Sequence, residues 1–589
     1  MKPLTRPASW GWFILAAFCF SLQVVPRFWS DSPLNDEPLE WTNGFYYWSG
    51  DLHHNLNHPP FATAVQALPA RLWLGPGPDL DRLDYMERGF YFLFNRSAGK
   101  WADLLASGRA VTFCFGLGIG LLLFGFLRER DPAAALVAGA LWAFEPTGLA
   151  YSDYVMSDLP LAFLCLAAVL AFGKSLSRPG WDWAFGTGAL AAMAATAKFS
   201  GLALLPIFVW GEWRHAKGWS GARALHETWN RWAWGVAGFL SWIFLLYLPG
   251  WWGLPGSGPW DSLRLFLAGL KDLLSFTGAG HPVFFLGSAG RQSHWLYYPT
   301  AFLLKTPIPF LALLAWALWG SLRRGWRAPN LVVTSALVFF ASIIPVQNLG
   351  VRYLLPAIPY LILIAATAAS RIWETAGPSA RAARWSVAGL LAWQAVSVAF
   401  AYPGHLAYFN DAVPAGMKAR LLGDSNLDLG QDVKRLADRA KAAGWPPVRL
   451  VQSSGFDPAA YGMAWKLWTD RDLEGPQPGR VYAVDVSFLQ LGPVFEPSLT
   501  PLAQCWITQI PPTERVGDSW WVWVIPGVPG PDSGRWVRSV PGFVRFSALR
   551  PKDWWNPMGG VTGPNLTAVI THPEAGNKKS ASGEKFSSP

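Results

Sequence analysis

Eleven apolar segments, of which the fourth and the sixth are short, are the feature that most constrains what this chain can fold into. A helix needs about 20 mostly apolar residues to cross the hydrocarbon core of a bilayer. Such segments recur through the first two thirds of the chain, and the loops between them hold most of the charge. The pattern predicts a polytopic α-helical membrane protein with spans at Trp10–Val25, Ala110–Leu127, Pro132–Leu149, Leu159–Phe172, Trp183–Ala197, Gly201–Trp210, Trp232–Leu248, Phe302–Leu322, Leu331–Pro345, Leu354–Ala369 and Trp385–Ala401.

The composition excludes a large soluble protein. Apolar residues make up 52% of the 589 residues and charged residues only 15%, against about 25% charged in ordinary soluble domains. Such a chain could not cover a soluble surface without large exposed apolar patches. The net charge of +10 could indicate nucleic-acid binding, but a membrane protein gathers Lys and Arg in its cytoplasmic loops.

The distribution of Lys and Arg predicts the orientation of the spans. The short connections on one face hold only Lys198 and Arg352. The positive-inside rule therefore puts the N-terminus in the cytoplasm, and an odd number of spans puts the C-terminus outside. The cations of the cytoplasmic face are Lys2, Arg6, Arg128, Arg130, Lys174, Arg178, Arg214, Lys217, Arg223, Arg231, Arg323, Arg324, Arg327, Arg371, Arg381 and Arg384.

The chain is predicted to have two domains and a tail. Residues 1–402 form a transmembrane domain with large extracytoplasmic loops at 26–109 and 249–300. Residues 403–570 are predicted to form an extracytoplasmic mixed α/β domain, and 571–589, rich in Lys, Ser and Gly, a disordered tail. The α/β domain shows a helix signal at Gly430–Ala443 and strand signals at Val448–Gln452, Val481–Val486 and Trp520–Ile525.

Two acidic clusters lie on the outer face. Asp36 and Glu37 follow the first span at the membrane–water boundary, where partial desolvation raises basicity and suits proton abstraction. Glu145, Asp153 and Asp158 lie between the third and fourth spans, and boundary acids are functional candidates because burying them is costly. The alternatives are a loop acid that caps a helix at the first cluster and an N-cap at Asp158.

Four cations on the outer face run against the charge bias: Lys198, Arg291, Lys305 and Arg352. A compensating anion is expected beside each one, and a lipid phosphate is one candidate. An acidic side chain or simple snorkelling is the alternative, and for Lys305 it is the preferred interpretation.

A metal site is not established by the sequence. His54 and His58 have H-x-x-x-H spacing, which on a helix would put both on one face. The stretch is rich in Asn and runs into Pro59 and Pro60, and the glutamate of H-E-x-x-H is missing. No cofactor is certain and a divalent ion remains open. The chain has no P-loop, GxGxxG or GxSxG context, so a nucleotide-driven pump is not favoured.

Several motifs in order resemble a known group of enzymes. A first span, then Asp36-Glu37, Gly50-Asp51 and His58-Pro59-Pro60, resembles the GT-C class of lipid-linked-sugar glycosyltransferases. The pattern is most similar to protein O-mannosyltransferases (glycosyltransferase family 39) and bacterial aminoarabinose-transferase-like enzymes. Further similar motifs cover most of Pro26–Gly462: Glu145–Pro160, Ala197–Gly201, His281–Gly287, Tyr297–Pro299, Lys305–Pro307, Asn348–Pro356, Tyr408–Asn410 and Asp424–Asp432.

The chain departs from the family pattern at three positions. Bacterial relatives usually have His where this chain has Glu40, Glu where it has Asn57, and Thr where it has Ser157. The family's contacts at the first two positions therefore do not carry over. The Asp36-Glu37 pair is kept.

The resemblance implies an inverting transfer of a sugar from a polyprenyl phosphate to an acceptor hydroxyl of a protein or glycolipid. It implies catalytic roles for Asp36 as the base, Glu37 as its assistant and Asp158 as a residue that orients hydroxyls or helps to bind a divalent ion. A phosphate leaving group needs cations rather than a general acid. The implied binding residues are Arg352, Lys198, Arg291, His58 and Tyr353.

This function would be carried out on the extracytoplasmic (periplasmic) face of a bacterial inner membrane, with no nucleic-acid partner. Two rivals remain open. A transporter would place charges near the bilayer midplane and show related halves, which this sequence does not. A non-catalytic envelope assembly protein would not need Asp36, Glu37 and Asp158 together.

Overall fold

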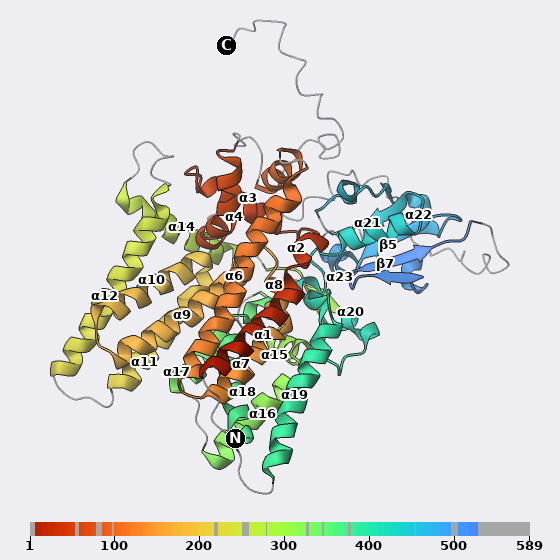
Figure 1. Ribbon diagram of the computed structural model, residues 1–589. Coiled ribbons are helices and arrows are strands. Elements are labelled where there is room, and N and C mark those ends of the chain that lie inside the picture. Colours follow the sequence, from red (N-terminus) through yellow and green to blue (C-terminus); the bar gives the residue numbers. More distant parts are fainter. Residues whose placement is uncertain are drawn as a thin grey trace, which may run out of the picture.

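The computed structural model describes residues 6–52, 58–77, 85–96, 99–216, 222–249, 258–278, 280–325, 329–343, 347–374, 379–453, 455–495, 497 and 505–527. The tail 571–589 and the end of the predicted α/β domain, from 528 to 570, lie outside these residues. Long helices run side by side through the first 400 residues, and a small sheet follows them (Figure 1).

A helix covers most of each predicted span. The helices are α1 Arg6–Val24, α6 Trp101–Arg128, α7 Pro132–Ala143, α9 Asp158–Ser177, α10 Trp181–Ala197, α11 Leu204–Ala216, α12 Ala222–Tyr247, α15 Tyr297–Lys305 with α16 Ile308–Arg324, α17 Asn330–Ile343, α18 Ile358–Trp373 and α19 Ala380–Phe400. Among the described helices, three are by themselves long and apolar enough to cross a membrane, and a bent pair makes a fourth. The helical multi-pass architecture is confirmed, and the number of eleven spans stays a prediction.

Two predicted spans are not continuous helices, which corrects the sequence-based expectation. Pro132–Leu149 breaks after α7, because the Glu145 side chain accepts a hydrogen bond from the Gly148 amide and begins a new helix, α8 (Pro146–Tyr151). Phe302–Leu322 breaks at Pro307, and α15 meets α16 at 115°. In both places a proline restricts the residue before it and ends the preceding helix.

The predicted loop 26–109 is itself helical where it is described. It holds α2 Arg27–Ser30, α3 Glu37–Tyr47, α4 Phe61–Leu74, α5 Tyr85–Phe90 and a π-helical turn, η1 Tyr91–Arg96. Helices α3 and α4 pack closely because Gly44 lies against the Thr63 carbonyl, where a side chain would not fit. They lie at the same end of the molecule as the C-terminal end of α1, far from the N-terminus (Figure 1).

Further elements connect these helices. They are the 3-10 turns η2 Phe199–Ala203 and η3 Val351–Leu354, helix α14 Pro259–Gly278, and the hairpin β1 Val283–Phe285 with β2 Ser288–Gly290.

The chain after α19 forms a five-stranded mixed sheet with flanking helices. The strand order is β4-β3-β5-β7-β6, in which β4, β3 and β5 are parallel and β7 and β6 are antiparallel to their neighbours. The elements are η4 His405–Ala407, η5 Ala415–Met417, α20 Lys418–Leu421, η6 Asp424–Asn426, α21 Val433–Ala442, β3 Val448–Val451, η7 Pro458–Tyr461, β4 Trp465–Leu467, α22 Asp470–Glu474, β5 Val481–Asp485, α23 Val486–Phe495, η9 Trp506–Thr508, β6 Glu514–Val516 and β7 Trp520–Val524. The three predicted strands and the predicted helix are confirmed.

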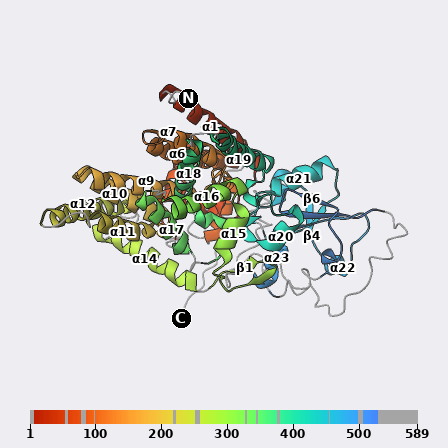
Figure 2. The same cartoon turned by 90° about the horizontal axis from the view of Figure 1, so that it is seen from below.

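Both faces of this sheet are buried. Leu436 of α21 packs with Trp520 on one face, whereas Trp506 packs with Trp523 on the other. Burial on both faces explains the unbroken apolar run of β5. In the two views the sheet lies to one side of the helices (Figures 1 and 2). The loop before α21 runs between the sheet and the helices, and it contributes to the site described next.

Candidate functional site

The N-terminus of α3 separates two neighbouring carboxylates. Glu37 is the first helical residue and its side chain is 0% exposed, whereas the Asp36 side chain just before it is 47% exposed. Asp36 occupies the N-cap position but makes no capping hydrogen bond. The alternative that this acid merely caps a helix is therefore not supported, and Asp36 is left facing the surface of the site.

Glu37 is bound on all sides. Arg109 of α6 donates to its two carboxylate oxygens at 2.9 and 2.7 Å, and the amides of Leu34 and Val155 donate at 3.0 and 2.9 Å. The remaining Arg109 hydrogen bonds go to backbone carbonyls, including that of Phe28 at 2.8 Å. A bidentate, fully buried pair of this kind fixes the position of α3 against α6.

A second buried ion network continues from this pair. Arg27 of α2 lies 2.5 Å from Asp153 and 3.3 Å from Asp31. Asp31 also accepts a hydrogen bond from Tyr154 at 2.6 Å and pairs with Arg435 of α21. The network therefore joins the first outer loop, the α8–α9 connection and the C-terminal region. It places Asp153, a member of the second predicted acidic cluster, in a structural role.

Asp36 faces a group of charges from three other elements. Arg352 of η3 lies 3.8 Å from Asp36 and 3.9 Å from Asp158 at the start of α9. Lys198, in the break after α10, lies 2.6 Å from Asp158. The structure thus brings together Asp36, Asp158, Lys198 and Arg352. The first and the last of them are more than 300 residues apart in the sequence.

Asp158 supports the two cations and does not cap its helix. It is the first residue of α9, and Ser157 before it is the N-cap residue, so the N-cap interpretation of Asp158 is wrong. Burial opposes the charge of Lys198, but the Asp158 carboxylate outweighs this and holds the pKa of Lys198 above its usual range. Tyr353 completes the group, because its ring lies 4.0 Å from the Lys198 ammonium and 5.7 Å from the Arg352 guanidinium.

Arg352 has donor capacity left over. The residue is 8% exposed, yet its buried Nε has no hydrogen-bond partner among the described residues. Its Nη1 lies 3.6 Å from the Met156 sulfur, a weak acceptor. An unsatisfied buried guanidinium is costly unless an anion completes its hydrogen bonds. With Lys198 beside it, Arg352 offers a site for an oxyanion such as a phosphate.

The loop that carries Arg352 is held by the chain after α19. Ser425 of η6 donates to the Leu349 carbonyl, and the Asn426 side chain accepts from the Val351 amide at 3.0 Å. Gly350 has φ of 100°, and a side chain there would collide with Ser425. Lys305 is buried and donates to the Asn426 carbonyl at 2.6 Å and to the Leu406 carbonyl at 2.7 Å. Its role is structural, but the snorkelling interpretation is wrong because the ammonium lies inside the protein and bonds to backbone carbonyls.

Asp424 is a site residue that the sequence did not single out. It has φ of 54°, which Asp tolerates better than most residues. Burial raises the pKa of Asp424, while His281 and Arg352 beside it act in the opposite direction and Asp36 acts with burial. In the sequence, Asp424 stood out only as part of the family-like motif Asp424–Asp432. Nothing in that motif indicated that Asp424 interacts with Asp36.

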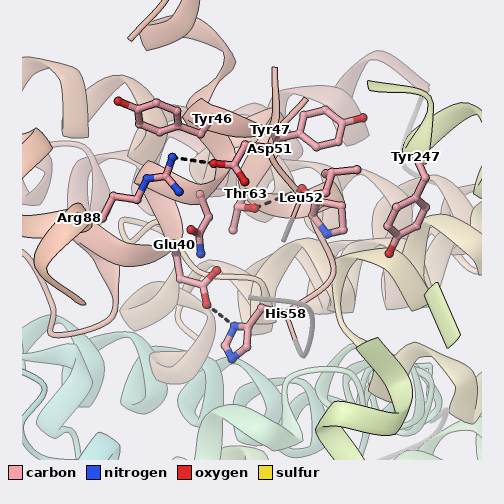
Figure 3. Close-up of a pocket in the computed structure, with 11 residues that line it drawn as sticks. Glu40, Tyr46, Tyr47, Asp51, Leu52, His58, Thr63, Arg88 and Tyr247 are labelled. Carbon is pink, nitrogen blue, oxygen red and sulfur yellow. Dashed lines mark hydrogen bonds and ion pairs between the residues drawn. The ribbon is translucent and has the colours of Figure 1, made fainter. Parts of the chain in front are cut away.

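Glu40 and His58 form a further pair next to Asp36. Glu40 lies one turn along α3 from Asp36, and its 6% exposed carboxylate pairs with Nδ1 of His58, whose side chain is 49% exposed. Both line a cavity of about 40 Å³ together with Asp51, Arg88 and Tyr247 (Figure 3). Sequence reasoning found Glu40 only as a departure from a family pattern.

Some predicted residues lie elsewhere. Arg291 is exposed and donates to the Val494 carbonyl at 3.2 Å, so the structure does not bring it to Asp36. Asn57 and His54 lie outside the described residues. Among the residues that are described, no group of three or more His, Cys, Asp or Glu side chains could hold a metal ion.

Solved structures of two proteins have a partly similar course of the chain. The apo structure of ArnT from Cupriavidus metallidurans shares 16% identity, covers 87% of this chain and 98% of that one, and gives a TM-score of 0.45. The same protein bound to undecaprenyl phosphate gives a TM-score of 0.43. The apo oligosaccharyltransferase of Archaeoglobus fulgidus gives 0.46 at 11% identity, covering 86% of this chain and 73% of that one.

Sequence comparison finds the same kind of relative. Protein O-mannosyl-transferase 2 of Drosophila pseudoobscura pseudoobscura is 26% identical over 211 residues, which are 33% of this chain. The match spans only 26% of that relative's length. A family model described as dolichyl-phosphate-mannose-protein mannosyltransferase (PMT) matches residues 34–254. The family resemblance read from the motifs is thereby confirmed by a match over residues 34–254 of this chain.

Proposed function

We propose that the protein is a membrane glycosyltransferase that moves a sugar from a polyprenyl-phosphate donor to an acceptor hydroxyl. The observation that carries the proposal is the half-exposed Asp36 carboxylate, 3.8 Å from Arg352, which in turn shares Asp158 with Lys198. The family described for residues 34–254 uses dolichyl phosphate mannose, which is a sugar on a polyprenyl phosphate.

The step uses one base and two cations. Asp36 accepts the proton of the acceptor hydroxyl while the hydroxyl oxygen forms a bond to the anomeric carbon. The bond from this carbon to the phosphate oxygen breaks, and the electron pair leaves with the phosphate. Arg352 and Lys198 stabilise the charge that develops there. Attack opposite to the leaving phosphate inverts the anomeric carbon.

The other site residues support these three. Asp158 holds Lys198 at 2.6 Å and approaches Arg352, so it sets the geometry of the phosphate site. Tyr353 packs under both cations. Glu37 fixes the start of α3 through its ion pair with Arg109, and it thereby positions Asp36. Arg291 has no role in this mechanism.

The side of the membrane on which we place the site follows from the distribution of Lys and Arg in the sequence. The site lies on the extracytoplasmic face of a bacterial inner membrane, where the lipid tail stays in hydrocarbon and the phosphate lies at headgroup depth. A protein or glycolipid hydroxyl reaches Asp36 from the aqueous side. Residues 1–402 form the transmembrane domain, and the α/β domain from 403 to 570 covers the site or selects the acceptor.

The test is a donor panel. Purified protein is incubated with a set of polyprenyl-phosphate sugars, and the loss of sugar from each lipid is measured by mass spectrometry. We expect one class of donor to lose its sugar in the presence of an acceptor hydroxyl. If no donor does so, while the protein in liposomes moves a solute across the membrane, the transporter alternative replaces the proposal.

A further inference from the structure

The most informative group outside the proposed step is the pair of Glu40 and His58. Glu40 is the residue of α3 that lies one turn after Asp36, and its amide donates to the Asp36 carbonyl at 3.0 Å. His58 stands just before Pro59 and Pro60 at the start of α4. The close packing of α3 and α4 at Gly44 and Thr63 brings the two side chains together.

The pair has the asymmetry of a proton-accepting dyad. The buried Glu40 carboxylate contacts Nδ1 of His58, so this nitrogen carries the hydrogen and Nε2 keeps its lone pair. No side chain of the described residues bonds to Nε2. A carboxylate that orients an imidazole in this way increases the ability of the other nitrogen to accept a proton.

His58 is surrounded by the charges of the site. Partial burial and Lys198 after α10 oppose its protonated form, whereas the Glu40 carboxylate and Asp36 of α3 favour it. Asp158 of α9 also interacts with it electrostatically. Together these charges hold the pKa of His58 above its usual range.

A polar cavity opens beside the dyad. It has a volume of about 40 Å³, enough for roughly two or three water molecules. The Asp51–Arg88 pair, at 2.6 Å, lies across it from Glu40 and His58 (Figure 3). An ordered chain of water molecules needs polar groups to bond to, and this cavity has them on opposite walls.

We propose that His58, oriented by Glu40, is a proton-relay residue that returns Asp36 to its ionised form after each transfer. The proton that Asp36 takes from the acceptor hydroxyl passes to Nε2 of His58. The imidazolium then releases it to water in the cavity of Figure 3. Asp36 ends as a carboxylate and His58 as a neutral ring, so the cycle balances with water as the final proton acceptor.

This inference rests on the proposed function, and its test is a set of pH profiles of the transfer rate. In the wild type we expect the rate to fall at acidic pH, where His58 stays protonated and cannot accept a proton. His58→Gln is expected to be at least tenfold slower at neutral pH and to lose this acidic limb. Glu40→Gln removes the partner that favours the protonated ring, so the acidic limb of this variant is expected to move to lower pH.

A control variant and a rescue experiment distinguish a proton-relay role of His58 from a role in folding. The exposed Glu374 at the end of α18 offers a matched control, and Glu374→Gln is expected to keep the wild-type profile. His58→Ala should regain rate as imidazole is added, because a small base can replace the missing ring, and a purely structural role would give no such recovery.

The outcomes of the two proposals are distinguishable. If the wild type transfers sugar but the acidic limb stays in place in His58→Gln and imidazole has no effect, the relay is wrong and the glycosyltransferase proposal stands. If no donor loses sugar with the wild type, the proposed function itself has failed, and the relay fails with it.

Discussion

Asp36 and Glu37 are neighbours in sequence and opposites in environment. Glu37 accepts four hydrogen bonds from Arg109 and two backbone amides and is 0% exposed. Asp36 is 47% exposed, and the cation that it pairs with among the described residues, Arg352, is 3.8 Å away. A carboxylate whose hydrogen bonds are satisfied is a structural element, whereas one with free lone pairs beside unsatisfied cations can react.

The same contrast separates the two groups of cations. Arg27 and Arg109 donate hydrogen bonds to Asp and Glu carboxylates and to backbone carbonyls inside the protein. In the part of the chain that the structure describes, Arg352 keeps an Nε without a hydrogen-bond partner and makes long contacts to Asp36 and Asp158. Burial alone therefore does not mark a functional charge. What marks it is burial without a full set of partners.

The largest expected effect is on transfer by Asp36→Asn. The amide cannot accept a proton, and general base catalysis contributes about 10²–10⁴ in rate. We expect a loss of this size in sugar transfer with an unchanged melting temperature. Asp438→Asn, at an exposed Asp that pairs with Lys434, is the matched control. Near-wild-type transfer by Asp36→Asn would remove this residue from the mechanism.

Glu37→Gln should show the reverse pattern. It leaves Arg109 buried without its charge partner, and breaking such a pair costs about 3–5 kcal/mol. Thermal unfolding of the purified protein should shift to clearly lower temperature, while the rate per folded molecule changes far less than in Asp36→Asn. Adding Arg109→Met to Glu37→Gln should recover part of the stability. Equal melting of Glu37→Gln and the wild type would contradict the comparison.

Arg352→Met tests the open cation. Loss of one preorganised donor to a developing oxyanion costs about 10²–10³ in kcat, and weaker binding of the lipid phosphate should also raise KM. Arg352→Lys is expected to recover only part of the rate, because the ammonium lacks the planar fork of the guanidinium. Steady-state kinetics with the donor identified by the panel measure both constants. If Arg352→Met changes only the stability of the protein, Arg352 has a structural role like that of Arg109.

The smallest expected effect is the pH dependence of stability at Glu40 and His58. Glu40 raises the folded-state pKa of His58, so the pair stabilises the fold below the unfolded pKa and loses this effect as pH rises through the folded pKa. The ring is half exposed, which limits the effect to about 1 kcal/mol or less. The melting difference between wild type and Glu40→Gln should therefore be larger at pH 5.5 than at pH 8.5, and an unchanged difference would count against the pair.

The sequence was sufficient for most helices and for four residues that meet in the site, because apolar periodicity and motifs can be read from the chain. These residues are Asp36, Asp158, Lys198 and Arg352. It was insufficient for the partners of those residues. Arg109 binds Glu37 across 72 positions, and Arg27 binds Asp153 across 126. No local pattern encodes such pairs, since they depend on how the helices pack. The breaks at Pro146 and Pro307 were visible in the sequence, but the apolar runs through them outweighed the proline signal.

The hydrogen bonds between η6 and the Arg352 loop have a consequence for dissecting the protein. Ser425, Asn426 and Asn410, which also donates to the Leu303 and Thr306 carbonyls, all lie beyond residue 402. A truncation at that point would cut away the brace of the phosphate site together with the sheet. Loss of activity in such a fragment would not show that the sheet recognises the acceptor. A cut after Asp432 would keep the brace and ask that question cleanly.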